Sequence, residues 1–180
     1  MAKPKCILLD AGPVIALHQT GVWGEFCGRY DVIVAETVAD DEALWHSKDE
    51  LTGARTAIRL RDDEAAGLIA IEGASSTELL AVTSRFDDVF AGGLHEGELE
   101  ALALLVERGG FEDTVFCAGD GAAIQAAVMI GLDERCESLE SLLKSAGLSK
   151  SLEWPFTAEF YERHRREGLD NRLNGLGLRR

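Results

Sequence analysis

Residues 6–13, CILLDAGP, decide the fold of this 180-residue chain. The apolar run before Asp10 predicts a buried strand, and the next three residues predict a turn. Pro13 suits the start of a helix, because the N–H that proline lacks has no partner there in any case. An acid at the tip of a buried strand, followed by a turn and a helix, is typical of parallel α/β proteins that hold metals or polar substrates. Asp10 is therefore the first candidate site residue.

Apolar runs that suit strands alternate with segments that suit helices along the rest of the chain. We expect strands at residues 5–10, 31–35, 67–73, 114–118 and 133–137. We expect helices at residues 13–19, 36–46, 77–86, 96–109, 122–130, 138–146 and 157–167, with a charged helical segment at 47–66. This alternation predicts an α/β fold, in which a parallel β-sheet flanked by helices forms a three-layer α/β/α sandwich. The last helix forms a C-terminal extension.

The composition is that of an ordinary folded protein of one domain. Apolar residues make up 46% of the chain and charged residues 28%, which excludes a disordered sequence. The four cysteines lie far apart without a C-x-x-C pair, so we expect free thiols in a reducing compartment. Asp10 interrupts the first apolar stretch, and no uncharged stretch is long enough to span a bilayer. We therefore expect a cytoplasmic protein without a membrane segment.

Further acids follow strands in the same way as Asp10. Asp120 lies between two glycines after an apolar run, in VFCAGDGAAI (residues 115–124). Each of these two acids either caps the helix that follows or holds a ligand. The acid run Asp40, Asp41 and Glu42 follows the strand at 31–35, and the sequence alone does not select which of the three enters a site.

A third acidic segment, HEGELEAL (residues 95–102), begins the most amphipathic helix. Glu98 is the acid expected to point into the site, because Leu102 lies four residues later on the apolar face. We expect Glu96 and Glu100 to lie on a solvated face, where acids in a first helical turn interact favourably with the helix dipole.

Carboxylates that converge on one crevice repel one another unless a divalent cation neutralises their charge. Oxygen ligands alone suit Mg²⁺ or Mn²⁺. The four histidines lack the spacing of a zinc site. The chain also lacks the phosphate-binding loop, the dinucleotide-binding glycine motif and the nucleophile elbow of hydrolases. We therefore expect a Mg²⁺ or Mn²⁺ site.

Four segments together resemble the PIN domain family of metal-dependent ribonucleases. They are ILLDAGPVIAL, VIVAETVADDEAL, HEGELEALALL and FCAGDGAAIQAAVMIGL, in this order. The chain is most similar to the subgroup that has Asp-x-x-Pro near its N-terminus and a Gly-Glu-x-Glu-Ala motif. The resemblance covers about residues 5–147, so we divide the chain into a PIN-like domain (1–147) and a C-terminal helical tail (148–180). Two positions depart from the subgroup, which often has Pro at the position of Ala35 and an acid at the position of Gly119.

The resemblance implies a Mg²⁺- or Mn²⁺-dependent endoribonuclease, which serves as the toxin of a toxin–antitoxin pair. Asp10, Glu98 and Asp120 match three acidic positions of the family. Its spacing selects Asp41 as the fourth, with Glu42 as the neighbouring alternative. By this resemblance Asp10 and Asp120 are direct metal ligands, whereas Glu98 and Asp41 hold a second ion or its waters. The implied partners are an RNA substrate and an antitoxin protein, and we also expect a homodimer.

Two questions stay open at this point. The net charge of −14 argues against general attraction to nucleic acid, so the rival hypothesis is a catalytically weak PIN-like module that binds a partner protein. The last 20 residues contain six Arg and three acids. Either these Arg residues contact RNA phosphates, or the helix at 157–167 simply packs through Phe156 and Phe160 and leaves them solvated.

Overall fold

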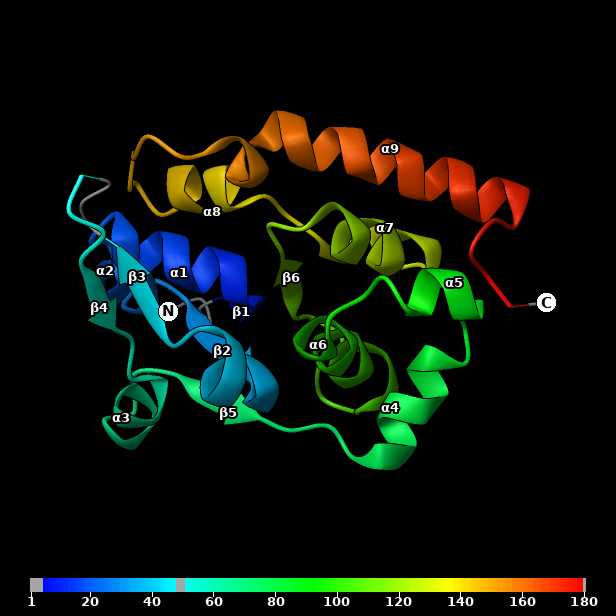
Figure 1. Ribbon diagram of the computed structural model, residues 1–180, viewed down its shortest axis with the longest axis horizontal. Coiled ribbons are helices and arrows are strands. Elements are labelled where there is room, and N and C mark those ends of the chain that lie inside the picture. Colours follow the sequence, from blue (N-terminus) through cyan, green and yellow to red (C-terminus); the bar gives the residue numbers. More distant parts are fainter. Residues whose placement is uncertain (1–4, 48–50, 180) are drawn as a thin grey trace.

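Four parallel strands form the main sheet of the computed structural model, which describes residues 5–47 and 51–179. Across the sheet the strands follow in the order β5 (Ala70–Glu72), β2 (Asp31–Ala35), β1 (Cys6–Leu9) and β6 (Val115–Cys117) (Figure 1). β1 pairs with β2 on one side and with β6 on the other, and Leu9 is level with Val34 and Cys117. The strands that follow β1 in the sequence lie first on one side of it and then on the other. Such a reversal leaves a crevice beyond the carboxyl ends of β1 and β6.

Helices flank this sheet, so the α/β class expected from the sequence is confirmed, and the arrangement is compatible with three layers (Figure 1). No helix of the described residues is long and apolar enough to cross a membrane. The helices are α1 (Ala11–Gln19), α2 (Trp23–Cys27), α3 (Leu60–Ala65), α4 (Ser76–Thr83), α5 (Asp88–Ala91), α6 (Glu96–Glu107), α7 (Gly121–Met129), α8 (Leu139–Ser145) and α9 (Ala158–Asn174), with short 3₁₀ turns η2 (Asp133–Arg135) and η3 (Trp154–Phe156).

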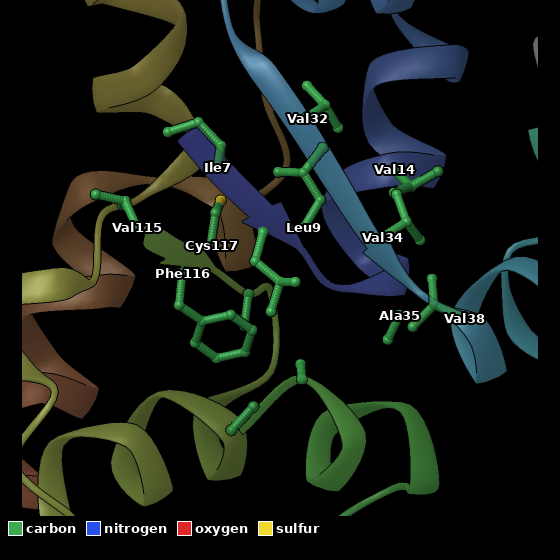
Figure 2. Packing of buried hydrophobic residues seen from close by; sticks show 14 of the residues in the cluster. Ile7, Leu9, Val14, Val32, Val34, Ala35, Val38, Val115, Phe116 and Cys117 are labelled. Carbon is green, nitrogen blue, oxygen red and sulfur yellow. The ribbon is translucent and has the colours of Figure 1, made fainter. Parts of the chain in front are cut away.

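The strands that carry the site are buried on both faces, as expected for a parallel sheet covered by helices. Leu8 and Leu9 of β1 are fully buried, as is Val34 of β2. Figure 2 shows these strands and β6 contributing side chains to one core, which includes Phe116. Truncation of a buried leucine of this kind to alanine typically costs about 2–5 kcal/mol. The acids that follow these strands are thus attached to well-buried strands of the core.

The segment from residue 36 to residue 66 differs from the expected pair of helices. A single π-helical turn, η1 (Val38–Glu42), replaces most of the first helix, and the Ala43 N–H donates to the Val38 carbonyl at 2.8 Å. An antiparallel hairpin of β3 (Trp45–Ser47) and β4 (Arg55–Ala57) follows, and only α3 remains of the second helix. The Arg55 guanidinium lies 4.8 Å from the centre of the Trp45 ring, a cross-strand contact that periodicity does not reveal. Residues 48–50 of the expected helix lie outside the described residues.

The strand expected at 133–137 is also wrong, because the 3₁₀ turn η2 occupies its first half. Only Cys136 pairs with the sheet, through a single bridge to Phe116. Arg135 explains the turn: its guanidinium donates to the carbonyls of Thr114 and Leu105 at 3.2 and 3.3 Å, and also to that of Phe111. These bonds hold the backbone away from an extended path.

The tail packs on the body instead of extending from it. Helix α9 is longer than expected and lies along α7 (Figure 1). The two helices approach closely at Gly168, where a Cβ atom would lie 2.9 Å from Val128 Cβ. Beyond α9 the chain continues beside α5, where the Asp87 N–H donates to the Gly177 carbonyl at 2.9 Å.

Candidate functional site

An open cleft of about 390 Å³ lies beyond the carboxyl ends of β1 and β6. Four acidic side chains line it. They come from the end of β1, from η1, from α6 and from the start of α7. The structure therefore brings together Asp10, Glu98 and Asp120, as the sequence predicts. Of the neighbouring candidates Asp41 and Glu42, only Glu42 lines the cleft. The full lining consists of Asp10, Ala11, Gly12, Glu42, His95, Glu98, Gly119 and Asp120.

Asp10 occupies the N-cap position of α1, yet its side chain makes no capping hydrogen bond. The sequence explains this, because the third helical residue is Pro13, which has no N–H to donate. The backbone of Asp10 continues the sheet instead, since its N–H donates to the Cys117 carbonyl at 3.0 Å. The residue is only 5% exposed. Its carboxylate thus lies buried in the cleft without a capping role.

Asp120 behaves in the opposite way. Its Oδ1 atom accepts hydrogen bonds from the backbone N–H groups of Ala122 and Ala123, at 2.7 and 3.4 Å, so it caps α7. The side chain is exposed on the wall of the cleft. Both bonds use the same oxygen, which leaves Oδ2 available to a ligand. Capping and a ligand role, which the sequence presents as alternatives, are compatible for this residue.

Glu98 and Glu42 lie on the part of the cleft where α6 meets η1. Glu98 is 3% exposed, and its Oε2 atom accepts the His95 N–H at 2.9 Å. The Oε1 atom of Glu42 accepts the Gly97 N–H at 3.1 Å. A side chain at Gly97 would overlap η1, because a Cβ atom there would lie 2.7 Å from Val38 Cγ2. The glycine of the Gly-Glu motif thus allows η1 to approach the first turn of α6.

Burial and mutual repulsion raise the pKa values of the two most buried acids. Burial is the main cause for Asp10, whose pKa is raised to about 7; the neighbouring Glu98 adds to the effect, while the Ala11 N–H opposes it. The pKa of Glu98 is also raised to about 7, again mainly by burial, and the His95 N–H opposes this rise. Glu42 and Asp120 raise both values further. The cleft therefore concentrates negative charge that costs free energy when all its acids ionise.

Asp41, which the family resemblance selects, is exposed and does not line the cleft. The π-helical turn provides the reason: a wider turn rotates Asp41 away from the buried face of Val38 and keeps Glu42 on that face. Asp40 also points elsewhere, since Arg61 donates to its two oxygens at 2.9 and 2.6 Å. This contact with Arg61 holds the pKa of Asp40 below its usual value.

Glu100 corrects a prediction from the sequence, which places it on a solvated face. In the structure the residue is only 5% exposed. Its two oxygens accept the Thr37 N–H at 2.7 Å and the Ala74 N–H at 3.0 Å. Glu100 thus fastens α6 to the residues that follow β2 and β5. The available signal was the surrounding run of apolar residues, Ala101–Leu105, which leaves little solvated face on this helix.

The chemistry of the cleft fits a hydrated hard cation better than a closed metal site. All four acidic side chains offer oxygen ligands, which Mg²⁺ and Mn²⁺ prefer. Among the described residues, no three His, Cys, Asp or Glu side chains form a ready coordination group. Mg²⁺ usually keeps several waters and needs only one or two protein carboxylates, with substrate phosphates completing its shell. The residues therefore fit such an ion through two of their carboxylates at a time.

No protein-family model matches the sequence, and no curated protein matches it either.

Proposed function

We propose that this protein is a Mg²⁺- or Mn²⁺-dependent ribonuclease whose active site is the acidic cleft. One observation carries the proposal: Asp10, Glu42, Glu98 and Asp120 line a single crevice at the switch point of a parallel sheet. Two of these acids are almost fully buried, and the cleft residues include no Lys or Arg to neutralise them. A fold tolerates such repulsion more easily when the site holds a cation.

In this proposal Asp10 and Asp120 are the direct ligands, because they follow neighbouring strands whose ends are aligned. When bound, the ion lowers the pKa of its water and stabilises negative charge on a phosphate group. Glu98 and Glu42 would accept hydrogen bonds from the ion's hydration water, and the backbone N–H groups of His95 and Gly97 keep their carboxylates oriented. The choice of RNA as the substrate, and of an antitoxin as a partner, follows from the PIN resemblance.

The test is incubation of the purified protein with single-stranded RNA in millimolar Mn²⁺ or in EDTA. We expect cleavage in Mn²⁺ only, and a loss on the order of 100-fold in the Asp10→Asn and Glu98→Gln variants. Glu96→Gln is the matched control, because Glu96 is exposed in the same helical turn as Glu98 and lies outside the cleft. Cleavage that persists in EDTA, or in Asp10→Asn, would refute the proposal.

A second candidate function is a partner-binding module with little catalysis, and the arrangement of the basic residues favours it. Several Arg residues of the tail form ion pairs within the chain, which reduces the positive charge available to RNA phosphates. The pairs are Arg163–Glu167, Arg165–Asp133, Arg165–Glu162, Arg172–Asp133 and Arg179–Asp88. This candidate predicts no Mn²⁺-dependent cleavage, and binding of a partner protein that Asp10→Asn leaves intact.

A further inference from the structure

One aromatic ring of the tail lies against both acid-bearing turns. Phe156, at the end of η3, faces Gly12 in the first turn of α1, just after Asp10, and Gly119, just before Asp120. A Cβ atom added at Gly12 would lie 3.3 Å from Phe156 Cε1, and one at Gly119 would lie 3.0 Å from Phe156 Cδ1. The two glycines also lie close to each other, because the same Cβ at Gly12 would be 3.8 Å from Gly119 Cα. The ring thus fills the space that a side chain at residue 119 would need.

A second ring lies on the other side of Asp120. A Cβ atom at Gly121 would lie 2.5–2.8 Å from the imidazole ring of His164, on α9. His164 is itself held by Gln125 of α7, whose Nε2 lies 3.0 Å from His164 Nδ1. Both glycines that flank Asp120 are therefore in contact with rings from the C-terminal segment.

These contacts matter because Gly-Asp-Gly is among the most flexible backbone sequences. Asp120 is exposed, so the core does not fix its side chain. A metal-binding carboxylate must nevertheless be held within about 0.5 Å of its productive position. We propose that Phe156 is a positioning residue for the acidic cleft, whose ring holds the turns of Asp10 and Asp120 in register. The tail is then part of the site, although none of its described residues, 148–179, lines the cleft.

The effect on metal binding rests on the proposed function and is tested with Mn²⁺ alone. Phe156→Ala is compared with Phe90→Ala, a matched control: Phe90 is half-buried like Phe156, and its ring also faces a glycine, Gly177, away from the cleft. Calorimetry should show Mn²⁺ affinity reduced about 10-fold or more in Phe156→Ala, and changed less than about 2-fold in Phe90→Ala. Melting in EDTA measures the general loss of packing in both variants. Equal Mn²⁺ affinities in the two variants would overturn the proposal.

A second measurement requires no metal. Asp120 Oδ1 accepts the N–H groups of Ala122 and Ala123, so amide hydrogen exchange at these residues reports how well the turn is held. Phe156→Ala should accelerate this exchange about 10-fold or more, and Phe90→Ala should leave it unchanged. If the wild-type protein binds no Mn²⁺, the ribonuclease proposal fails and the exchange alone decides the role of Phe156. Unchanged exchange in Phe156→Ala would then refute that role.

Discussion

Asp10 and Asp120 follow neighbouring strands in the same sequence context, yet their carboxylates have different partners. Asp120 caps α7, whereas Asp10 makes no capping bond because Pro13 occupies the position that would donate it. The order of residues thus predicts that both acids reach one crevice, since parallel strands end at the same edge. The degree to which each acid is buried is not predictable in this way, because it depends on how closely α6 and η1 approach the ends of the strands. Burial is the main reason why the pKa of Asp10 lies above that of an ordinary carboxyl group.

The clearest prediction at this scale concerns two neighbouring acids. Glu42 lines the cleft and accepts the Gly97 N–H, while Asp41 is exposed outside it. Glu42→Gln should reduce Mn²⁺-dependent RNA cleavage about 10-fold or more, because it removes a negative charge from the site. Asp41→Asn removes the same charge one residue away and should change the rate less than about 2-fold. Initial rates at matched protein concentration provide the comparison, and the reverse order of effects would restore Asp41 to the site.

At the scale of elements, local pattern predicts some segments well and others poorly. β1, β2, α4, α6 and α8 are recognisable because a buried face or a capping residue marks each of them within its own residues. Ser75 illustrates this: it forms a capping box with Glu78, with bonds of 3.3 and 2.7 Å. The π turn and the hairpin after β2 are different, because contacts with distant residues determine them. The Leu44 carbonyl, for instance, accepts the Ile58 N–H at 2.9 Å and closes the segment across 14 residues.

A prediction about Glu100 tests how α6 is held to the segments that follow β2 and β5. Its two oxygens accept backbone N–H groups after β2 and β5, and no water reaches them easily at 5% exposure. Glu100→Gln replaces one acceptor by an amide that donates, which leaves a buried N–H without a partner. We expect a loss of about 1–3 kcal/mol in the free energy of unfolding, measured by urea denaturation.

Glu96→Gln serves as the control for this measurement, since Glu96 is exposed in the same helix. It should change the free energy of unfolding by less than about 0.5 kcal/mol. If Glu100→Gln is equally mild, Glu100 does not hold the helix to the sheet in solution.

The whole molecule combines a net charge of −14 with four acids around one cleft. Ion pairs elsewhere compensate part of this charge: Arg108, for example, binds Glu78 at 2.8 Å and Glu72 at 3.2 Å. The cleft residues include no Lys or Arg. In the metal-free protein at neutral pH, the acids of the cleft should therefore repel one another. Composition alone does not reveal where in the molecule this repulsion lies.

The pH dependence of stability follows from the raised pKa values in the cleft. The pKa of Asp10 rises from 3.8 to about 7 on folding, and that of Glu98 rises from 4.5 to about 7. At pH values between the unfolded and the folded pKa, the folded state therefore binds more protons than the unfolded state. Their contribution to stability is fully present below the unfolded values and is lost as the pH rises through 7. The metal-free protein should lose on the order of 3–4 kcal/mol per carboxyl over this range.

Asp10→Asn isolates this effect, because asparagine does not titrate. In EDTA the variant should gain stability relative to the wild type as the pH rises from about 5 to about 8. Urea denaturation at several pH values provides the measurement. A constant difference between the two proteins across this range would show that Asp10 titrates normally.

The most direct test of the central claim is the melting temperature in Mn²⁺ and in EDTA. A ligand that binds only the folded state stabilises it by RT ln(1 + [L]/Kd), so a Kd about 10-fold below millimolar Mn²⁺ gives about 1.4 kcal/mol. For a chain of this length, we expect a rise of about 3–5 °C in the wild type and in Glu96→Gln. Asp10→Asn should melt higher than the wild type in EDTA at pH above 7 and should gain little from Mn²⁺. A wild-type melting temperature that millimolar Mn²⁺ leaves unchanged would contradict a cation site in the cleft.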